Sequence, residues 1–458
     1  MTFVEYINSI KEKRIGVIGI GVSNTPLIEA LLKSGCDVTA CDKRSKEQLS
    51  DEFDRLSGLG AKFSLGDAYL DALDFDIIFR TPGLMPFDEH LAAFVDGGGE
   101  LTSEMEVFFK LCPCRIIAVT GSDGKTTTTT VISELLKAQG YTVHLGGNIG
   151  NPLLCSVDTM LPGDFAVLEL SSFQLHSMHC RPDVAVITNI SPNHLDKHKD
   201  YRDYYDAKAS VFLEQSADNL LVLNLENDIT PHYASMAPSR VSYFSRFNKP
   251  ENGVYAENGI VYRIKNGISQ KIMCADDIRL PGTHNLENYM AAFAAVDGLV
   301  SDETCIEVAK TFAGVEHRLE TVRILNGVTY INDSIGTSPS RTAAGLHALK
   351  TKPILIAGGY DKHIPFDSLG DDICLYAKSL FLTGTTAEKI ADAVRNSKYY
   401  TPDFPMVIMD DFTETVLAAS HSAQNGDIVL LSPACAAFDK FKNFMERGKY
   451  FKKIVMEL

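Results

Sequence analysis

Short apolar runs that end in glycine-rich turns or polar residues recur along the whole chain. In the N-terminal part such runs occur at residues 14–18, 36–41 and 75–79, and residues 26–33 show helical spacing of apolar positions. Short apolar runs bounded by turns are typical of strands buried in a parallel sheet, and the helix between the first two runs completes a βαβ unit. The pattern predicts a small Rossmann-type module that ends near Ser103.

Two further modules continue this pattern. The second has apolar runs at 116–119, 165–170 and 184–189, and after Lys208 it changes to hairpin-like pieces at 253–255 and 259–262 and a helix from Asn285 to about Val300. The third begins near Val315, with expected strands at 328–330, 353–356, 379–382 and 427–431. A chain of 458 residues is long enough for about three domains. We therefore expect an α/β protein with domains at 1–105, 106–313 and 314–458.

A phosphate-binding loop follows the apolar run at 116–119. Gly121 and Gly124 permit backbone angles that direct successive N–H groups at phosphate oxygens, and the following helix adds a positive N-terminus. Lys125 can reach the β- and γ-phosphates, and the Thr126 hydroxyl can bind Mg²⁺. Val119 stands where the full P-loop pattern has its first glycine, but the preceding strand still favours an ATP or GTP site over a flexible turn.

The residues expected to contact the nucleotide are consecutive: Gly121, Ser122, Asp123, Gly124, Lys125, Thr126 and Thr127. The middle domain is therefore expected to be a P-loop-like ATPase α/β domain. It would lie between a Rossmann-type N-terminal domain and a Rossmann-like C-terminal domain.

Polar residues at the ends of neighbouring strands extend this site. In open parallel sheets the ligand crevice lies at the carboxyl ends of the strands, where Glu169 and Asn189 fall. A buried carboxylate beside Thr126 is costly unless a cation balances it, so we expect Glu169 to bind Mg²⁺. For His194 two interpretations stay open, a metal ligand or a structural hydrogen bond, and the neighbouring His198 does not decide between them.

A second glycine turn follows the first strand. Gly19 and Gly21 are followed by Asn24, and Asp42 lies about twenty residues further on. This spacing resembles a dinucleotide-binding fingerprint, but Asn24 replaces the third glycine, which allows close packing of helix on strand. The match to an NAD site is therefore weak.

Charge and composition limit the kinds of partner and binding site that we expect for the chain. With 43 Lys and Arg against 59 Asp and Glu the net charge is −16, so nucleic acids and anionic membranes are repelled on average. The ten cysteines include no C-x-x-C pair, and Cys112-Pro113-Cys114 has no partner cluster nearby, so we expect neither a disulfide framework nor a zinc site. No run approaches the ~18 apolar residues that span a bilayer, and the N-terminus lacks the pattern of a signal peptide. We expect a cytoplasmic monomer.

Several motifs occur in a fixed order along the chain. They are Thr120–Thr126, Gly147–Gly150, Leu168–Leu175, Asn193–Asp196, Gly282–Asn285, Glu316–Arg318, Asn332–Ser334, Gly358–Lys362 and Leu431–Ala436. In this order they resemble the Mur ligases of peptidoglycan synthesis, and the resemblance covers nearly the whole chain. The blocks at 170–175, 358–362 and 432–436 resemble the branch that adds D-glutamate. The Asp-Asn-Pro-Arg-like block of the diaminopimelate and lysine adders does not occur in the sequence.

The resemblance implies an ATP-dependent ligase that joins D-glutamate to UDP-N-acetylmuramoyl-L-alanine, with no nucleic-acid or membrane partner. The first domain would bind UDP rather than NAD, the middle domain ATP, and the last domain the amino acid. The residues implied around the UDP moiety are Val22, Ser23, Asp42, Lys43, Thr81, Pro82 and Gly83. Those implied at the muramoyl-alanine part are Asn148, Ser171 and Gln174, and those around the adenosine and ribose are Asn285, Arg318 and Asp333.

The same resemblance implies chemistry through an acyl phosphate. ATP phosphorylates the alanyl carboxylate, the D-glutamate amine attacks, and a tetrahedral intermediate collapses to the amide and phosphate. Phosphoryl transfer between anions needs cations, which agrees with a catalytic Lys125 and two Mg²⁺ ions. Thr126 and Glu169 would bind one ion. By resemblance, His194 and a carbamylated Lys208 would bind the second, because a carbamate can bind Mg²⁺ and an ammonium cannot.

Two positions depart from the family at the amino-acid pocket. Ile335 stands where many relatives have lysine, and Ala437 where they have serine, and both residues usually help to bind the D-glutamate carboxylates. Loss of a cation weakens binding of a dianion, so we expect Arg341, beside Pro339 at a helix start, to replace it. The other residues expected in this pocket are Lys362, Thr337 and Phe444.

Three alternatives stay open at this point. A folylpolyglutamate synthase-like ligase, or a Mur-type ligase for another amino acid, shares the middle and last domains, although the N-terminal module argues against the former. A nucleotide-binding ATPase without ligase activity would not require Lys208 together with His194, or the block at 358–362. An NAD-binding redox protein is the weakest alternative, because its fingerprint is incomplete.

Overall fold

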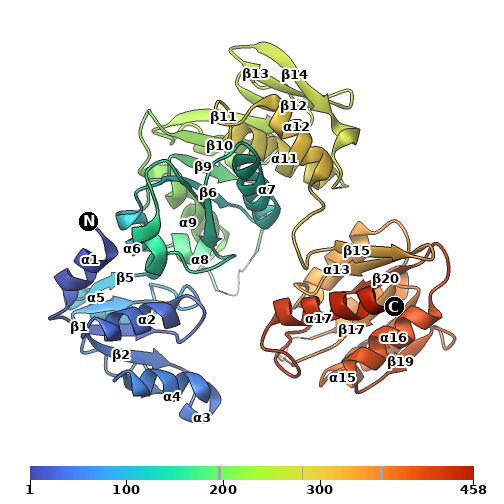
Figure 1. Cartoon of the computed structure of the whole chain (residues 1–458), viewed down its shortest axis with the longest axis horizontal. Coiled ribbons are helices and arrows are strands. Elements are labelled where there is room, and N and C mark those ends of the chain that lie inside the picture. Colours follow the sequence, from blue (N-terminus) through green and yellow to red (C-terminus); the bar gives the residue numbers. More distant parts are fainter. Residues whose placement is uncertain (194–196, 281, 362–364) are drawn as a thin grey trace. The chain divides into compact units, whose positions relative to one another are not determined.

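The computed structural model describes residues 1–193, 197–280, 282–361 and 365–458 (Figure 1). The chain divides into two compact units, Met1–Phe312 and Ala313–Leu458, and each unit is considered by itself. The first unit contains two sheets and the second contains one. The architecture is α/β, which confirms the fold class expected from the apolar pattern.

The first sheet has five parallel strands in the order β3-β2-β1-β4-β5. The strands are β1 (Arg14–Ile18), β2 (Asp37–Asp42), β3 (Lys62–Leu65), β4 (Ile77–Phe79) and β5 (Glu100–Thr102). The helices are α1 (Phe3–Ile10), α2 (Asn24–Lys33), α3 (Lys46–Leu49), α4 (Asp51–Gly58), α5 (Glu89–Asp96) and α6 (Glu104–Leu111). Because β1 pairs in parallel with both β2 and β4, the predicted Rossmann-type module is confirmed.

The second sheet has nine strands in the order β14-β13-β12-β11-β10-β9-β6-β8-β7. The strands are β6 (Arg115–Thr120), β7 (Val143–Gly147), β8 (Phe165–Glu169), β9 (Val184–Ile187), β10 (Leu220–Asn224), β11 (Arg240–Ser245), β12 (Gly253–Glu257), β13 (Ile260–Lys265) and β14 (Ile268–Cys274). Strands β6 to β12 pair in parallel, while β12, β13 and β14 pair antiparallel, which confirms the predicted hairpin.

The helices that accompany this sheet are α7 (Lys125–Ala138), η1 (Leu154–Thr159), α8 (Ser172–Leu175), α9 (Tyr201–Leu213), α10 (Thr230–Tyr233), η2 (Ala275–Asp277), α11 (Thr283–Ala295) and α12 (Asp302–Thr311). Alternate residues of β6 pack on opposite faces of the sheet. Ile116 and Ala118 belong to one hydrophobic core, and Ile117 and Val119 belong to another. Burial of both faces explains why this strand is apolar at successive positions.

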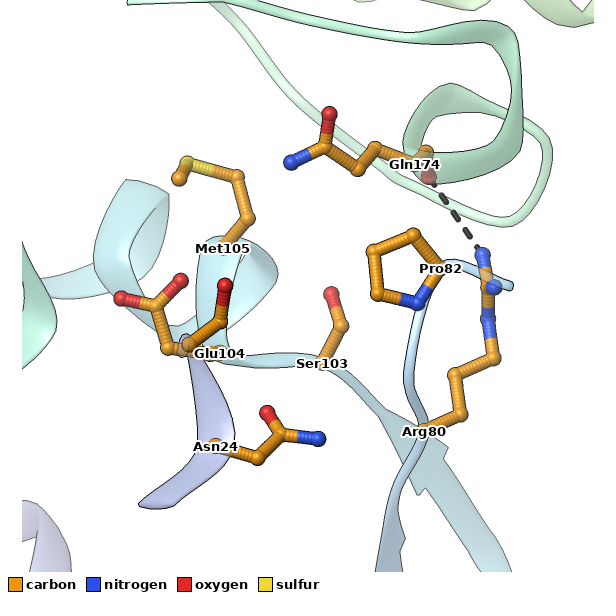
Figure 2. Close-up of a pocket in the computed structure, with 8 residues that line it drawn as sticks. Asn24, Arg80, Pro82, Ser103, Glu104, Met105 and Gln174 are labelled. Carbon is orange, nitrogen blue, oxygen red and sulfur yellow. Dashed lines mark hydrogen bonds between the residues drawn. The ribbon is translucent and has the colours of Figure 1, made fainter. Parts of the chain in front are cut away.

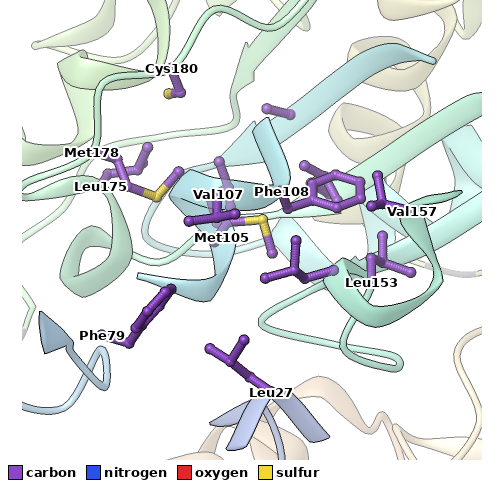
Figure 3. Close-up of a cluster of buried hydrophobic side chains, with 14 of the residues drawn as sticks. Leu27, Phe79, Met105, Val107, Phe108, Leu153, Val157, Leu175, Met178 and Cys180 are labelled. Atoms are coloured by element: carbon purple, nitrogen blue, oxygen red, sulfur yellow. The ribbon is translucent and has the colours of Figure 1, made fainter. Parts of the chain in front are cut away.

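One hydrophobic core joins the two sheets of the first unit (Figure 3). Leu27 of α2, Phe108 of α6 and Val157 of η1 are buried in it, together with Leu175 of α8. Side chains from the region of the first sheet therefore share one apolar interior with side chains from the region of the second sheet. This packing fixes the crevice of the first sheet relative to α8.

The second unit contains a six-stranded sheet in the order β15-β16-β20-β17-β18-β19. The strands are β15 (Glu320–Leu325), β16 (Val328–Asn332), β17 (Ile354–Ala357), β18 (Ser379–Leu382), β19 (Met406–Ile408) and β20 (Ile428–Leu431). The helices are α13 (Pro339–Ala348), α14 (Asp367–Tyr376), α15 (Ala387–Arg395), α16 (Phe412–Ser422) and α17 (Phe444–Glu457). All strand pairs are parallel except β15 with β16, so the Rossmann-like C-terminal module is confirmed.

The structure corrects two details of the predicted elements. The helix expected to run to about Val300 is α11, which ends at Ala295, because Gly298 adopts a φ of 76° in the turn that follows. Several strands were not predicted, among them the edge strands β15 and β19. The residues of these two edge strands are mostly half-buried or exposed, so they lack the apolar runs that mark the central strands.

The ten cysteines are all free thiols. Among the residues that the structure describes, no helix combines the length and the apolar composition that crossing a membrane requires.

Candidate active site

The loop between β6 and α7 adopts a backbone that depends on its glycines. Gly121 has a φ of 144° and Gly124 a φ of 77°, both in the region that favours glycine. A Cβ on Gly121 would lie 1.9 Å from Thr188 Oγ1, and a Cβ on Gly124 would lie 2.3 Å from Asn288 Oδ1. Packing and backbone angles therefore both require glycine at these positions.

Residues at the end of β9 hold the loop from one side. Thr188 Oγ1 donates a hydrogen bond to Asp123 O at 2.6 Å, and Asn189 Oδ1 accepts one from the Asp123 N–H at 3.0 Å. The Lys125 amine bends back over the loop and donates to the carbonyl oxygens of its first two residues at 2.9 and 2.8 Å. The loop thus carries a cation at the place where a triphosphate would enter.

Glu169, the last residue of β8, is buried beside the loop. Its Oε2 accepts a hydrogen bond from Thr126 Oγ1 at 2.6 Å, and its Oε1 accepts one from Asn148 Nδ2 at 2.7 Å. The side chain is only 2% exposed, and both donors are neutral. A carboxylate next to a hydroxyl oxygen is a ligand set that suits Mg²⁺, and the cation would offset the cost of burying the negative charge.

Lys208 of α9 reaches the same loop. Its Nζ donates a hydrogen bond to Gly121 O at 2.8 Å and lies 4.7 Å from the centre of the Tyr204 ring, whose hydroxyl shares a 2.8 Å hydrogen bond with Ser122 Oγ. The side chain is 1% exposed. Burial, assisted by the Lys125 cation, lowers the pKa of Lys208 well below its usual value. Burial of this kind favours the neutral amine.

A hydrogen-bonded group of histidines lies next to the start of α9. His198 Nδ1 is 2.8 Å from Asp203 Oδ2, and its Nε2 is 2.9 Å from Ser172 Oγ. His176 Nε2 is 2.9 Å from Asp203 Oδ1. Burial lowers the pKa of His198, so a neutral ring connects α8 with α9. Of the two histidines considered from the sequence, His198 makes structural hydrogen bonds, and His194 lies outside the described residues.

The glycine turn of the first sheet surrounds Asp42. Gly19 has a φ of 88°, and a Cβ there would lie 2.8 Å from Thr81 Cβ. Asp42 Oδ2 accepts a hydrogen bond from the Ile20 N–H at 2.7 Å and forms an ion pair with Arg44 at 3.0 Å. The carboxylate therefore holds the turn, and Arg44 supplies a cation that the sequence interpretation did not include.

A cavity lies between the first sheet and α8 (Figure 2). Its lining residues are Ser23, Asn24, Arg80, Pro82, Ser103, Glu104, Met105 and Gln174. Asn24 Nδ2 donates to Ile18 O at 2.9 Å, which explains how asparagine is accommodated where a dinucleotide fingerprint has glycine. Of the residues expected near UDP, Ser23 and Pro82 line the cavity, whereas Val22, Lys43 and Gly83 are exposed.

Arg80 directly follows β4 and was not singled out from the sequence. Its Nε and Nη2 donate to Ser177 Oγ at 3.1 and 2.8 Å, and its Nη2 also donates to Phe173 O at 2.8 Å. The side chain is 1% exposed, and burial lowers the pKa of Arg80 to about 10. Arg80 thus connects the first sheet to α8, next to Gln174 (Figure 2).

In the second unit, Asp333 directly follows β16 and is buried. Ser432 Oγ donates a hydrogen bond to Asp333 Oδ2 at 2.6 Å, and the Leu319 N–H donates to Oδ1 at 3.2 Å. Burial raises the pKa of Asp333 to about 6, although Arg318 and Arg341 act in the opposite direction. The carboxylate therefore lies at the carboxyl ends of β16 and β20, where the ligand crevice of a parallel sheet is expected.

Arg447 of α17 is a second buried arginine that the sequence interpretation missed. Its Nη2 donates to the carbonyl oxygens of Ser334 and Cys435, both at 3.0 Å, and its Nη1 donates to Ala436 O at 3.1 Å. Ser334 Oγ donates to Phe444 O at 2.8 Å. Burial lowers the pKa of Arg447 to about 10. This guanidinium holds together two of the segments that contain the family motifs, 332–334 and 431–436.

The residues expected in the amino-acid pocket differ in their exposure. Arg341 is exposed, and its Nη1 lies 3.5 Å from Ile335 O. Thr337 is half-buried, and Ala437 is 2% exposed. Lys362 lies outside the described residues.

Within the first unit, the structure brings Asn148, Glu169 and Lys208 together around the loop. Ser171 accepts a hydrogen bond from the Gln174 N–H and caps α8. Asn285 lies on α11, where its Oδ1 accepts a hydrogen bond from Asn288 Nδ2 at 3.2 Å. The other two residues expected around the adenosine, Arg318 and Asp333, belong to the second unit.

Comparison with known proteins places the chain in a family. Residues 119–296 match the Mur ligase middle domain, and residues 317–435 match the Mur ligase, glutamate ligase domain. The UDP-N-acetylmuramoylalanine--D-glutamate ligase of Ruminiclostridium cellulolyticum is 50% identical over 459 residues, which covers 99% of this chain and 98% of that protein. The protein of the same name from Acetivibrio thermocellus is 50% identical over 455 residues, which covers 98% of both chains.

Solved structures share the fold at low sequence identity. The UDP-N-acetylmuramate-alanine ligase MurC from Thermotoga maritima aligns with a TM-score of 0.57 and 17% identity over 97% of this chain and 100% of that chain. A pseudomurein peptide ligase type C from Methanothermus fervidus aligns with a TM-score of 0.52 and 20% identity over 97% of this chain and 100% of that chain. Together with the identity to relatives over the full length, these matches show that the chain belongs to the Mur ligase family.

Proposed function

We propose that the chain is an ATP-dependent amide ligase that adds D-glutamate to UDP-N-acetylmuramoyl-L-alanine. The observation that carries this proposal is the meeting of a phosphate-binding loop with the buried carboxylate of Glu169 and the buried amine of Lys208. The substrates follow from the names of relatives that are 50% identical over nearly the whole chain.

The reaction proceeds in two steps. The bond between the γ-phosphorus of ATP and its bridging oxygen breaks, an alanyl carboxylate oxygen bonds to that phosphorus, and ADP leaves. The neutral D-glutamate amine then attacks the acyl carbon, phosphate leaves with the electrons of the C–O bond, and the nitrogen gives one proton to solvent. Lys125 stabilises the charge on the transferred phosphoryl group, which is the main demand of such a transfer.

Mg²⁺ fits the oxygen ligands of this site, and when bound it neutralises the phosphate oxygens. Thr126 and Glu169 would hold one ion, and His194 and a carbamylated Lys208 would hold the second. The burial of Lys208 supports this modification, because CO₂ adds only to the neutral amine. In that step an N–C bond forms, the nitrogen gives a proton to water, and two carbamate oxygens become available as ligands.

The remaining contacts are assigned by domain, with ranges 1–105, 106–313 and 314–458. Residues proposed around UDP are Val22, Ser23, Asp42, Lys43, Thr81, Pro82 and Gly83. Residues proposed at the muramoyl-alanine part are Asn148, Ser171 and Gln174. Residues proposed around ATP, besides Gly121–Thr127, are Asn285, Arg318 and Asp333. We propose that the ligase works as a cytoplasmic monomer, which light scattering during gel filtration of the purified chain would test.

The D-glutamate carboxylates are proposed to bind Arg341, Thr337, Lys362 and Phe444. Arg341 supports this role because its exposed guanidinium lies beside Ile335, the position at which many relatives have lysine. A guanidinium can bind a carboxylate through two hydrogen bonds.

A phosphate-release assay tests the proposed function. ATP, Mg²⁺ and UDP-N-acetylmuramoyl-L-alanine are supplied with D-glutamate, L-glutamate, lysine or diaminopimelate in parallel. Release of phosphate with D-glutamate alone, with the amide product found by mass spectrometry, is the expected result. Release with another amino acid would reject the substrate assignment, and release without any amino acid would indicate an ATPase.

A further inference from the structure

Three strands of the second sheet bring a thiol, an imidazole and a carboxylate together at the end opposite the phosphate-binding loop. Cys114 directly precedes β6, Asp164 directly precedes β8, and His144 is the second residue of β7. One potential ligand atom of each side chain lies within 4.8 Å of those of the other two. Because β8 lies between β6 and β7, the three residues are neighbours across the sheet although they are far apart in the sequence.

Strand register places these side chains on one face of the sheet. The first residues of β6 and β8 are paired, so the residues just before them, Cys114 and Asp164, point to the same face. His144 is paired with Ala166, two positions after Asp164, and therefore shares that face. The cluster thus follows from the strand register and does not depend on a loop.

Cys112 lies beside this group of three residues but is not part of it. Its Sγ lies 4.0 Å from Cys114 O, and the two thiols interact with each other. Cys114 is buried and Cys112 is half-buried, so the pair lies at the edge of the hydrophobic core. The group of three therefore offers one sulfur atom, one imidazole and one carboxylate, and Cys112 is a second thiol next to that of Cys114.

The imidazole of this cluster is already oriented. His144 Nε2 is 2.9 Å from Asp164 Oδ2, which also accepts a hydrogen bond from the Leu161 N–H at 3.0 Å. The side chains of His144 and Asp164 are 22% and 12% exposed, so the cluster remains accessible from solvent.

The charges near this cluster also favour the binding of a cation. The Asp183 carboxylate interacts with Cys112 and accepts a hydrogen bond from the Ile116 N–H at 2.7 Å. The Arg115 guanidinium lies over the Phe165 ring at 4.3 Å. Asp164 and Asp183 together carry more charge than this one arginine, so the local balance is negative before any thiol loses its proton.

We propose that Cys112, Cys114, His144 and Asp164 form a binding site for a borderline-soft divalent metal ion such as Zn²⁺. Thiolate and imidazole ligands suit Zn²⁺, whereas Mg²⁺ and Ca²⁺ prefer oxygen ligands alone. On binding, two sulfur–metal bonds form and the two thiol protons pass to water. The site connects the starts of β6, β7 and β8 and is separate from the Mg²⁺ ligands at their other ends.

Two other clusters of potential metal ligands occur among the residues that the structure describes, and neither contains a thiol. In the cluster of Glu316, His317 and Glu320, both carboxylates form ion pairs with Lys452, at 3.0 and 2.6 Å. The cluster of His176, His198 and Asp203 contains no sulfur and belongs to the hydrogen-bonded group beside the phosphate-binding loop.

Metal titration of the full chain tests the proposal. The protein is freed of metal with a chelator in the presence of a reductant, titrated with Co²⁺ while thiolate-to-cobalt charge-transfer absorption is recorded, and then with Zn²⁺ as competitor. We expect one metal ion per chain at this site. Cys114→Ser and His144→Gln should each weaken Zn²⁺ binding by at least about tenfold, since even substitution of outer partners has an effect of that size.

Cys155→Ser is the matched control, because Cys155 is an exposed free cysteine outside the cluster, and it should bind Zn²⁺ as the original chain does. Cys112→Ser is a second variant at a half-buried position, and circular dichroism of each metal-free variant verifies its fold. Absence of thiolate absorption, unchanged binding in folded Cys112→Ser and Cys114→Ser, or a Cys112–Cys114 disulfide in protein purified under reducing conditions would overturn the proposal. The test does not involve ligase substrates, so its outcome is independent of the proposed function.

Discussion

Replacement of Gly124 by alanine should disable the phosphate-binding loop without unfolding the protein. The new Cβ would lie 2.3 Å from Asn288 Oδ1, whereas ordinary van der Waals contact begins at 3.4 Å. The loop or the Asn288 side chain therefore has to move by about 1 Å, and a displacement of that size can lower a rate about 100-fold. The φ of 77° adds a backbone strain of about 1–2 kcal/mol.

The chain offers a matched control for the strain. Gly140, just after α7, has a φ of 99°, and a Cβ there would meet no atom within 4 Å. Gly140→Ala should therefore lose a similar free energy of unfolding, about 1–2 kcal/mol, but keep its activity. The comparison separates the effect of the displaced loop from the effect of lower stability.

The assay is ATP- and D-glutamate-dependent phosphate release, with chemical denaturation of each variant alongside. We expect kcat/KM for ATP to fall about 100-fold in Gly124→Ala and by less than about threefold in Gly140→Ala. Asn288→Ala removes the atom that the new Cβ would meet, so the double variant should lose less activity than the two single effects predict. Equal activity in Gly124→Ala and Gly140→Ala would refute the reasoning.

Three further predictions concern single side chains. Lys208→Ala should abolish ligation, and added short carboxylates should restore part of it if a carbamate oxygen is the missing ligand; no recovery at any carboxylate concentration counts against the carbamate. Arg341→Ala should raise the D-glutamate KM about tenfold, or ~1.4 kcal/mol, whereas Arg395→Ala, another exposed arginine of the second unit, should leave it unchanged. An unchanged KM in Arg341→Ala rejects that contact. Because burial raises the pKa of Asp333 from 3.8 to about 6, the unfolded carboxyl ionises first, so the contribution of this carboxyl to stability falls as the pH rises from about 4 to about 6, by about 3 kcal/mol in total. Asp333→Asn should flatten this part of the pH profile of unfolding free energy, and an identical profile in the variant contradicts the assignment.

Features encoded by neighbouring residues could be predicted from the sequence. The strand before Gly121, the glycines of the loop and the helix that begins at Lys125 are all visible in one short segment, because periodicity and backbone freedom are local properties. Glu169 was predicted beside Thr126 because Glu169 ends one parallel strand and Thr126 follows another, and the carboxyl ends of these strands meet at the same edge of the sheet.

The buried arginines could not be predicted in this way. Arg80 is held by Ser177, 97 positions away, and Arg447 by Ser334, 113 positions away, and several of their partners are backbone carbonyls that occur at every residue. No residue pattern identifies which carbonyls will converge on a guanidinium. For the same reason the proximity of Cys114, His144 and Asp164 could not be predicted. Only the strand order β6-β8-β7 makes these residues neighbours.

The charge of Lys125 contributes to the low pKa of Lys208 in the candidate active site. Lys125 Nζ and Lys208 Nζ both donate to the carbonyl oxygen of Gly121, at 2.9 and 2.8 Å. Two ammonium groups around one oxygen repel each other, and burial penalises the charge on the more buried amine, which is Lys208. The neutral form of Lys208 is therefore favoured, and the proposed reaction with CO₂ requires that form. A charged, buried Lys208, measured by NMR of its labelled amine at neutral pH, would contradict this reasoning.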